Sequence, residues 1–388
     1  MVNAVITTLK KRFFKKGIGM KEVCVGSKGL DGIVVGDTAL SLVDGQKGIL
    51  IYCGYNIDQL ASKNFTEICH LFLYGHLPNK DEEENLKIAL GQRYTLPKDV
   101  VSFLERQSKK DHPMGTLRTA VSMLSGFRSE PDLNSHEELV ECAIDLIAKT
   151  GTIVSAISRI RSSKEPLSPD ANLSFADNFL YMSTGEIPEK KMMRAFDTAL
   201  ILHMDHGFNA STFTARVVTS SLSDMISAVT AAIGSLKGPL HGGANTAVMK
   251  MLKEIGSVEN VEAWLSNTLT EKKKVMGFGH RVYKVLDPRA KHLKRMSQEW
   301  GEIAKEKKWF QISEKLEKLM LEKKGLNANV DFYSASTYYT MGIEPEMYTP
   351  IFAVARMVGW TAHVIEQLKD NRIMRPSANY IGPIGKML

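Results

Sequence analysis

The sequence predicts a protein built almost entirely from α-helices. Apolar residues recur at steps of three and four along most of the chain, strand-like segments are few, and two proline-containing pairs mark helix starts. The 388 residues are enough for two domains, and a composition of 44% hydrophobic and 24% charged residues is typical of a globular protein. We therefore expect an all-α fold with a large core.

Residues 222–236 give the clearest helical period, because one apolar stripe runs from Leu222 through Met225, Ile226, Val229 and Ile233 to Leu236 before Gly238-Pro239 ends it. Thr349-Pro350 and Asp287-Pro288 each resemble an N-cap and a first helical residue. They predict helices through about Leu368 and Trp300. Residues 83–90, 137–147, 247–255 and 312–322 also predict helices.

Strand signals are confined to the N-terminal part of the chain. Residues 48–52 are the best candidate, with residues 33–35 and 39–43 nearby. We expect one small N-terminal β element. There is no glycine-rich nucleotide-binding pattern after a strand, and no internal repeat.

The formal net charge of +7 is spread along the chain, except in an N-terminal stretch whose basic residues precede the first acid, Glu22. We interpret this stretch as a solvated basic tail, since transit peptides are rich in Arg and Ser rather than Lys. A nucleic-acid-binding scaffold would also be basic, but no basic helix or cluster of stacking aromatics stands out. The sequence has no apolar run of about 18–20 residues, so we expect no membrane span.

The four cysteines form no C-x-x-C pair, which argues against a disulfide framework and a zinc site and favours the cytoplasm. His203 and His206 are three residues apart, but Asp205 does not complete a convincing set of metal ligands. We therefore expect no metal site.

Segment 238–245, GPLHGGAN, places His241 in a glycine-rich turn between two predicted helices. Glycine lets a ligand approach the backbone, and a helix N-terminus disfavours positive charge. We therefore expect a neutral imidazole that donates a hydrogen bond, which is a group able to stabilise an enolate oxygen. A histidine that only caps the turn fits the same pattern and, for this segment alone, is the commoner case.

Segment 276–284, MGFGHRVYK, places His280 beside glycines, and DPRA (287–290) follows it. Arg289 falls in the first turn of the helix expected after Asp287. Helix N–H groups together with a guanidinium suit a carboxylate ligand. The alternative is that Arg289 pairs with Asp287 at the surface.

Two further charged residues lie in apolar surroundings. Asp331, in NVDFY (329–333), would have a raised pKa that suits a general base, although aspartate is also common near an N-cap. Arg356 interrupts an apolar helix, and a buried guanidinium requires an anion. That anion is either an internal carboxylate such as Glu366 or a carboxylate of the substrate.

Five motifs occur in a fixed order: LHMDHGFNAS (202–211), GPLHGGAN (238–245), GFGHRVYK (277–284) with DPR (287–289), NVDF (329–332) and RP (375–376). GY (54–55) and LYGHLP (73–78) precede them. From about residue 29 to residue 383 the chain resembles the citrate synthase family. Its length resembles the short forms that lack an extra N-terminal domain.

The resemblance implies a homodimer with a basic tail at residues 1–28, a large domain at residues 29–242 and 343–388, and a smaller mobile domain at residues 243–342. It implies that Asp331 removes a proton from the acyl-CoA, that His241 stabilises the enol, and that His280 polarises the carbonyl of oxaloacetate. The residues implied to bind oxaloacetate are His206, Asn209, Arg289, Arg356 and Arg375, the last from the partner subunit. Those implied to contact coenzyme A are Val275, Met276, Gly277 and Lys284.

The implied reaction joins acetyl-CoA to oxaloacetate, with a coenzyme A thioester as co-substrate and no prosthetic group, and implies no nucleic-acid or membrane partner. Many family members read Arg-Pro-Arg where this chain has Arg375-Pro376-Ser377. That variant, like FNASTF (208–213), also resembles 2-methylcitrate synthases, which use propionyl-CoA. Because GHR (279–281) resembles citrate synthases more, we expect citrate synthase, with 2-methylcitrate synthase as the alternative.

Overall fold

The computed structural model describes residues 28–30, 32–187, 189–280, 282–384 and 386. The predicted basic tail lies outside the described residues, apart from Lys28. The chain divides into two compact units, Ala39–Ile373 and a second unit of Met1–Thr38 with Met374–Leu388. Every α-helix and β-strand of the described residues lies in the first unit.

The described residues of the first unit form sixteen α-helices and one small sheet, which confirms the predicted all-α fold with an N-terminal β element. The helices are α1 (Ile57–Leu60), α2 (Phe65–Tyr74), α3 (Lys80–Gly91), α4 (Lys98–Gln107), α5 (Pro113–Met123), α6 (His136–Arg161), α7 (Phe175–Thr184), α8 (Lys190–His203), α9 (Ala210–Ser220), α10 (Met225–Leu236), α11 (Ala244–Ile255), α12 (Val261–Thr270), α13 (Ala290–Ile303), α14 (Lys308–Lys324), α15 (Val330–Thr340) and α16 (Tyr348–Lys369). The strands β1 (Ser41–Asp44), β2 (Ile49–Tyr52) and β3 (Tyr55–Asn56) pair antiparallel in that order.

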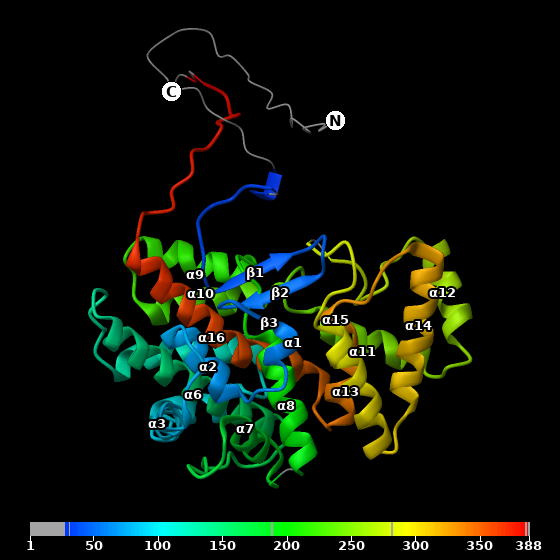
Figure 1. Cartoon of the computed structure of the whole chain (residues 1–388), viewed down its shortest axis with the longest axis horizontal. Helices are drawn as coiled ribbons and strands as arrows, with labels where there is room; N and C mark the ends of the chain where they lie inside the picture. Colours follow the sequence, from blue (N-terminus) through cyan, green and yellow to red (C-terminus); the bar gives the residue numbers. More distant parts are fainter. Residues whose placement is uncertain (1–27, 31, 188, 281, 385, 387–388) are drawn as a thin grey trace. The chain divides into compact units, whose positions relative to one another are not determined.

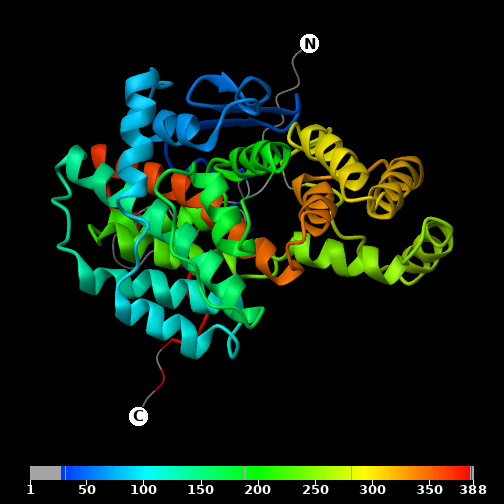
Figure 2. The same cartoon turned by 90° about the horizontal axis from the view of Figure 1, so that it is seen from below.

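Helix α16 is the centre of this unit. Nearly every side chain from Tyr348 to Ile365 is buried, including Trp360 and the charged Arg356. Figures 1 and 2 show α16 passing between the other helices, and it packs against α6, α8, α9 and α10. Helices α11 to α15 form a group on one side of the unit in both views and pack mainly on one another.

Several predicted boundaries shift for identifiable reasons. Leu222 is not part of the α10 stripe: it has φ 63°, is 60% exposed, and precedes the true N-cap, Asp224. Helix α16 begins before Thr349, whose hydroxyl instead donates to the carbonyl of Gly242. The N-cap of α13 is Arg289 rather than Asp287.

Of the three predicted strand segments, residues 33–35 form no strand and are exposed, so that prediction is wrong. Exposure removes the half-buried surface that stabilises a strand. The other two segments become β1 and β2, and β3 was not predicted. Within the described residues, every helix is too short or too polar to cross a bilayer. The boundary between a large and a small domain stays a prediction.

Candidate active site

The predicted residues come from six separate places in the chain. His206 lies between α8 and α9, His241 between α10 and α11, and His280 between α12 and α13. Arg289 caps α13, Asp331 lies in the first turn of α15, and Arg356 lies within α16.

The fold brings these residues together. The rings of His206 and His280 meet edge to face with centroids 5.3 Å apart, and Nε2 of His206 lies 3.3 Å from the hydroxyl of Tyr283. The charge of Arg289 acts on the pKa of both histidines and of Asp331. Two histidines, an arginine and a carboxylate from distant segments therefore share one site.

The backbone fixes the proton of His280. Its Nδ1 atom accepts hydrogen bonds from the amides of Val282 and Tyr283, at 3.0 and 3.1 Å. A backbone amide only donates, so in the neutral ring the proton is on Nε2. Burial, followed by the charge of Arg289, lowers the pKa of His280 to about 4. At neutral pH the ring is an uncharged donor through Nε2.

His241 has the opposite tautomer. Its Nε2 atom accepts a hydrogen bond from the amide of Ser211 at 3.3 Å and lies 2.8 Å from the Ser211 hydroxyl oxygen. The proton of the neutral ring is therefore on Nδ1. Burial, followed by the charge of Arg356, lowers the pKa of His241 to about 4. The predicted neutral imidazole is found, with burial rather than a helix dipole as its first cause.

Ser211 is itself held in place, which fixes the ring of His241. The indole N–H of Trp360 donates to the Ser211 hydroxyl oxygen at 3.1 Å, and that hydroxyl lies 2.8 Å from Oδ1 of Asn209. Asn209 is the N-cap of α9, where it accepts from the amides of Ser211 and Thr212. Its side chain thus supports Ser211, whereas its predicted contact with substrate stays a prediction.

Asp331 has the raised pKa that was predicted for it. Burial raises the pKa to about 6, against the opposing charges of Arg289 and Arg356. Its place in the first turn of α15 is fixed because Asn329 caps the helix and accepts from the amide of Asp331. The carboxylate is therefore largely ionised at neutral pH and is still a stronger base than an exposed aspartate.

The two motifs that carry His280 and Asp331 are joined through their backbones. The amide of Asn329 donates to the carbonyl of Gly277 at 2.9 Å. The amide of Gly279 donates to the carbonyl of Asn327 at 3.0 Å. Gly277 has φ 83°, and a Cβ there would lie 2.7 Å from the ring of Phe332. Only glycine allows this approach, which holds residues 277–279 against the start of α15.

Arg289 forms an ion pair with Asp287, and the pair is buried rather than at the surface. Its Nε and Nη2 atoms donate to the two carboxylate oxygens at 3.0 and 2.7 Å, and both side chains are at most 3% exposed. No hydrogen bond joins its Nη1 atom to another described residue. The charge of Arg289 thus acts on His206 and His280, and its Nη1 atom can donate to a ligand.

Arg356 is buried without a carboxylate partner among the described residues. Its Nε atom donates to the carbonyl of His203 at 2.8 Å, and its guanidinium lies over the ring of Phe352. Burial lowers its pKa to about 10, so it remains charged at neutral pH. Glu366, the internal partner considered from the sequence, pairs with Arg216 instead. A buried cation in this position favours an anionic ligand.

The predicted coenzyme A residues flank His280 in the sequence, within residues 275–284. Val275 is buried, Met276 is half-buried, and Lys284 is exposed with its amide bound to the carbonyl of Gly45. Arg375 is exposed and belongs to the other unit of the chain. Sequence reasoning missed Ser211, Tyr283 and Trp360, although the first two lie inside the quoted motifs. Their roles depend on contacts across 30 to 149 positions, which no local pattern reveals.

These residues define an all-α enzyme site that combines neutral histidines, two buried arginines and the carboxylate of Asp331. Residues 29–377 match the sequence profile of the family "Citrate synthase, C-terminal domain". Citrate synthase 2 of Bacillus subtilis (strain 168) is 48% identical over 92% of this chain and 96% of its own length. The citrate/2-methylcitrate synthase of the same organism is 41% identical over 92% and 96%.

Solved structures agree with this result. The ternary complex of citrate synthase from Thermoplasma acidophilum with carboxymethyl coenzyme A and oxaloacetate superimposes with a TM-score of 0.88 at 34% identity, covering 93% of this chain and 97% of that one. This chain belongs to the citrate synthase family. It is an enzyme of the acyltransferase class.

Proposed function

We propose that this enzyme condenses acetyl-CoA with oxaloacetate and water to give citrate and coenzyme A. The observation that carries the proposal is the pair of opposite tautomers: His241 presents Nδ1–H and His280 presents Nε2–H, with a carboxylate of raised pKa, Asp331, in the same site. The names of the relatives, and the oxaloacetate bound in the Thermoplasma acidophilum structure, support the choice of substrates.

In the first step, Asp331 removes a proton from the methyl group of the thioester. The negative charge moves to the thioester oxygen, where Nδ1–H of His241 donates a hydrogen bond and stabilises the enol. Because His241 is neutral at working pH, its Nδ1–H group shares its proton with the thioester oxygen through this hydrogen bond. No metal ion or prosthetic group is required, since a base and a donor flank the acidic carbon.

In the second step, the enol carbon attacks the carbonyl carbon of oxaloacetate. Nε2–H of His280 donates to that carbonyl oxygen, where charge develops as the carbon–carbon bond forms. Arg289 and Arg356 bind the carboxylates of oxaloacetate, and His206 orients it from beside His280. Water then hydrolyses the thioester, releasing coenzyme A as the thiol and leaving the third carboxylate of citrate.

Coenzyme A is the co-substrate, and residues 275–277 are proposed to line its adenine. Lys284 is exposed and suits a phosphate group. The proposal places the enzyme in the cytoplasm.

Domain movement is part of the proposal. Residues 243–342 would close as a small domain on the rest, with the turn at Gly242 and Gly342 (φ 78°) as hinge positions. Closure on oxaloacetate would exclude water from the enol. Small-angle scattering that is unchanged by oxaloacetate would contradict it.

We further propose a homodimer in which Arg375 enters the site of the partner subunit. Pro376 keeps Arg375 out of a helix, and residues 371–384 have no regular secondary structure. Mixing inactive Arg375→Ala and Asp331→Asn chains tests this, because a mixed dimer has one site with both defects and one with neither. Recovered activity supports exchange of the arm. No recovery, with subunit exchange confirmed by mass, contradicts it.

The alternative acyl donor is propionyl-CoA, because one relative is named citrate/2-methylcitrate synthase and the chain has Ser377 after Arg375-Pro376. Initial rates with acetyl-CoA and propionyl-CoA, each against oxaloacetate and followed by release of the free thiol, separate the two. We expect kcat/KM to favour acetyl-CoA at least about tenfold, the range given by one methylene in a pocket. Asp331→Asn should abolish turnover with either thioester and still bind oxaloacetate. Near-normal kcat in that variant would overturn the mechanism.

A further inference from the structure

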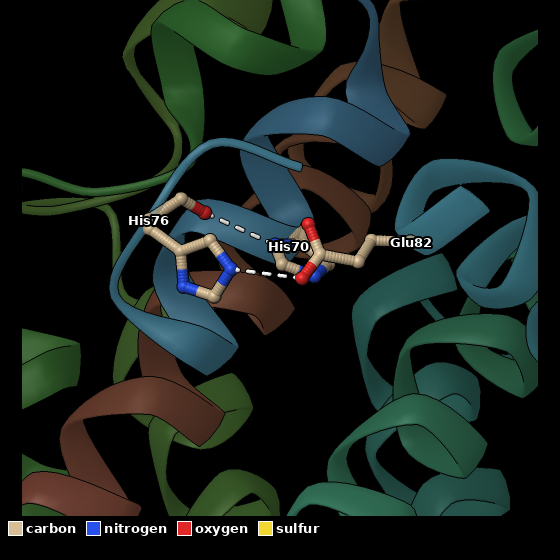
Figure 3. Close-up of side chains that lie close together, drawn as sticks. All are labelled: His70, His76 and Glu82. Carbon is tan, nitrogen blue, oxygen red and sulfur yellow. Dashed lines mark hydrogen bonds and ion pairs between the residues drawn. The ribbon is translucent and has the colours of Figure 1, made fainter. Parts of the chain in front are cut away.

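Three side chains with metal-ligand chemistry meet where α2 ends and α3 begins. His70 lies in α2, His76 follows its C-cap, and Glu82 lies in the first turn of α3. One ring nitrogen of each histidine and one oxygen of Glu82 lie within 4.8 Å of one another. Figure 3 shows the three side chains pointing toward one another. None of these residues takes part in the active site.

The buried histidine has its lone pair directed by the backbone. His70 is 4% exposed, and its Nδ1 atom lies 3.0 Å from the carbonyl oxygen of His76. A carbonyl only accepts, so Nδ1 carries the proton and Nε2 carries the lone pair. No described residue forms a hydrogen bond with that Nε2 atom. The lone pair of that Nε2 atom is therefore unused and is suited to a cation.

The backbone also directs the ring of His76, whose Nε2 atom, unlike that of His70, has a partner. Its Nδ1 atom lies 3.3 Å from the carbonyl oxygen of Tyr74, so Nδ1 donates and Nε2 points the other way. Nε2 lies 3.2 Å from Oε1 of Glu82. Histidines that bind metals usually donate their second ring N–H to a carbonyl or carboxylate, which fixes tautomer and orientation. Both histidines here have that support from the backbone.

Glu82 is held by the capping box of α3. Its Oε2 atom accepts from the amide of Asn79 at 2.8 Å, while Asn79 accepts from the amide of Glu82. Only Oε1 therefore faces the histidines. The carboxylate is ordered before any ligand arrives, which lowers the entropic cost of binding.

We propose that Nε2 of His70, Nε2 of His76 and Oε1 of Glu82 bind one divalent zinc ion, with water in the fourth position. Two imidazoles and a carboxylate are typical protein ligands of zinc. Zinc takes the place of the proton between His76 and Glu82, so binding releases a proton when His76 is protonated. The ion joins the end of α2 to the start of α3, and it does not depend on the proposed reaction.

The test uses the untagged full-length protein, stripped with a chelator and dialysed against zinc chloride. Elemental analysis should give one zinc per chain, and a competing chromophoric chelator gives the affinity. His76→Gln and Glu82→Gln each remove one ligand at the surface, and glutamine at position 82 retains the capping box. We expect each variant to bind zinc more than about 100-fold more weakly, which exceeds the loss seen when a residue that only supports a metal ligand is changed.

His136→Gln and Glu84→Gln are the matched controls, because both residues are exposed and neither belongs to the cluster. They should bind zinc as the parent protein does. Zinc should also raise Tm of the parent and of the controls but not of the two ligand variants. Citrate formation should be equal in all five proteins. A parent protein that binds no zinc, or ligand variants that bind it as tightly as the parent, would overturn the proposal.

Discussion

Nε2 of His363 lies 3.2 Å from Oδ2 of Asp205, and both side chains are fully buried. The same oxygen accepts hydrogen bonds from the hydroxyl of Ser41 and the amide of Gly207. One carboxylate thus ties β1, the loop that carries His206, and α16 together. Burial alone would raise the pKa of Asp205, but His363, the charge of Arg356 and the hydrogen bond from Ser41 together outweigh burial and lower it.

Replacing Asp205 by Asn should lower the free energy of unfolding by about 3–5 kcal/mol at pH 7, because His363 loses a buried partner. A carboxyl with a lowered pKa stabilises the fold above its unfolded pKa of about 3.9, and this contribution is lost as pH falls. The difference from the parent should therefore shrink below about pH 4. Urea unfolding of both proteins at several pH values measures this difference in the free energy of unfolding. Asp99→Asn, at an exposed position, is the control and should change little.

Ser211→Ala should slow catalysis through His241 while the histidine itself is unchanged. The backbone amide of Ser211 still donates to Nε2, so we expect kcat to fall by about tenfold rather than to vanish. The indole N–H of Trp360 also loses its acceptor, at about 1–3 kcal/mol of stability. Steady-state rates and thermal unfolding test both effects. Ser221→Ala, at the exposed end of the same helix, should change neither.

The pH dependence of activity should have a single resolved acid limb. Asp331 accepts a proton only when ionised, and its pKa is raised to about 6, so activity should fall as pH decreases through 6. His241 and His280, whose pKa values are lowered to about 4, stay neutral over that range. The measurement is kcat/KM for the thioester at saturating oxaloacetate. A limb below pH 5 would contradict the assignment of the base.

Alanine variants of Gly277 and Gly279 distinguish the cost of tight packing from the cost of backbone strain. Both glycines have similar positive φ angles, 83° and 76°. Alanine at position 279 would meet nothing closer than Leu326 at 3.9 Å, so it should cost only the strain of about 1–2 kcal/mol. Alanine at position 277 would also clash with Phe332 and Val248, which adds about 1–3 kcal/mol. Gly277→Ala should also reduce kcat, since Phe332 adjoins Asp331. Equal losses of stability would show that the packing is not tight.

Asp287→Asn should weaken the site by releasing Arg289. The variant leaves a buried guanidinium without its anion, and we expect it to unfold about 3 kcal/mol more easily. Oxaloacetate supplies a new anion, so it should raise Tm more in the variant than in the parent protein. Thermal unfolding with and without oxaloacetate measures this. An equal shift in both proteins would mean that Arg289 does not bind the substrate.

Much of the fold follows from local patterns in the sequence. The apolar period predicted α10 and the Thr349-Pro350 pair predicted α16, and the predicted helices at residues 83–90, 137–147 and 312–322 lie inside longer observed ones. Their exact ends depend on caps that compete with neighbouring candidates, as Asp224 does for α10. The raised pKa of Asp331 and the burial of Arg356 were predictable because both charges lie inside apolar sequence.

The sequence by itself determined the helical class, the family motifs and most of the candidate site. Only the tertiary structure decided that Arg289 is paired in the interior, that Ser211 sets the tautomer of His241, and that His70 and His76 face Glu82. The physical reason is the distance along the chain over which each kind of interaction acts. Periodicity and capping act over three or four residues, whereas protonation and ligand geometry depend on which distant loops the packed core holds together.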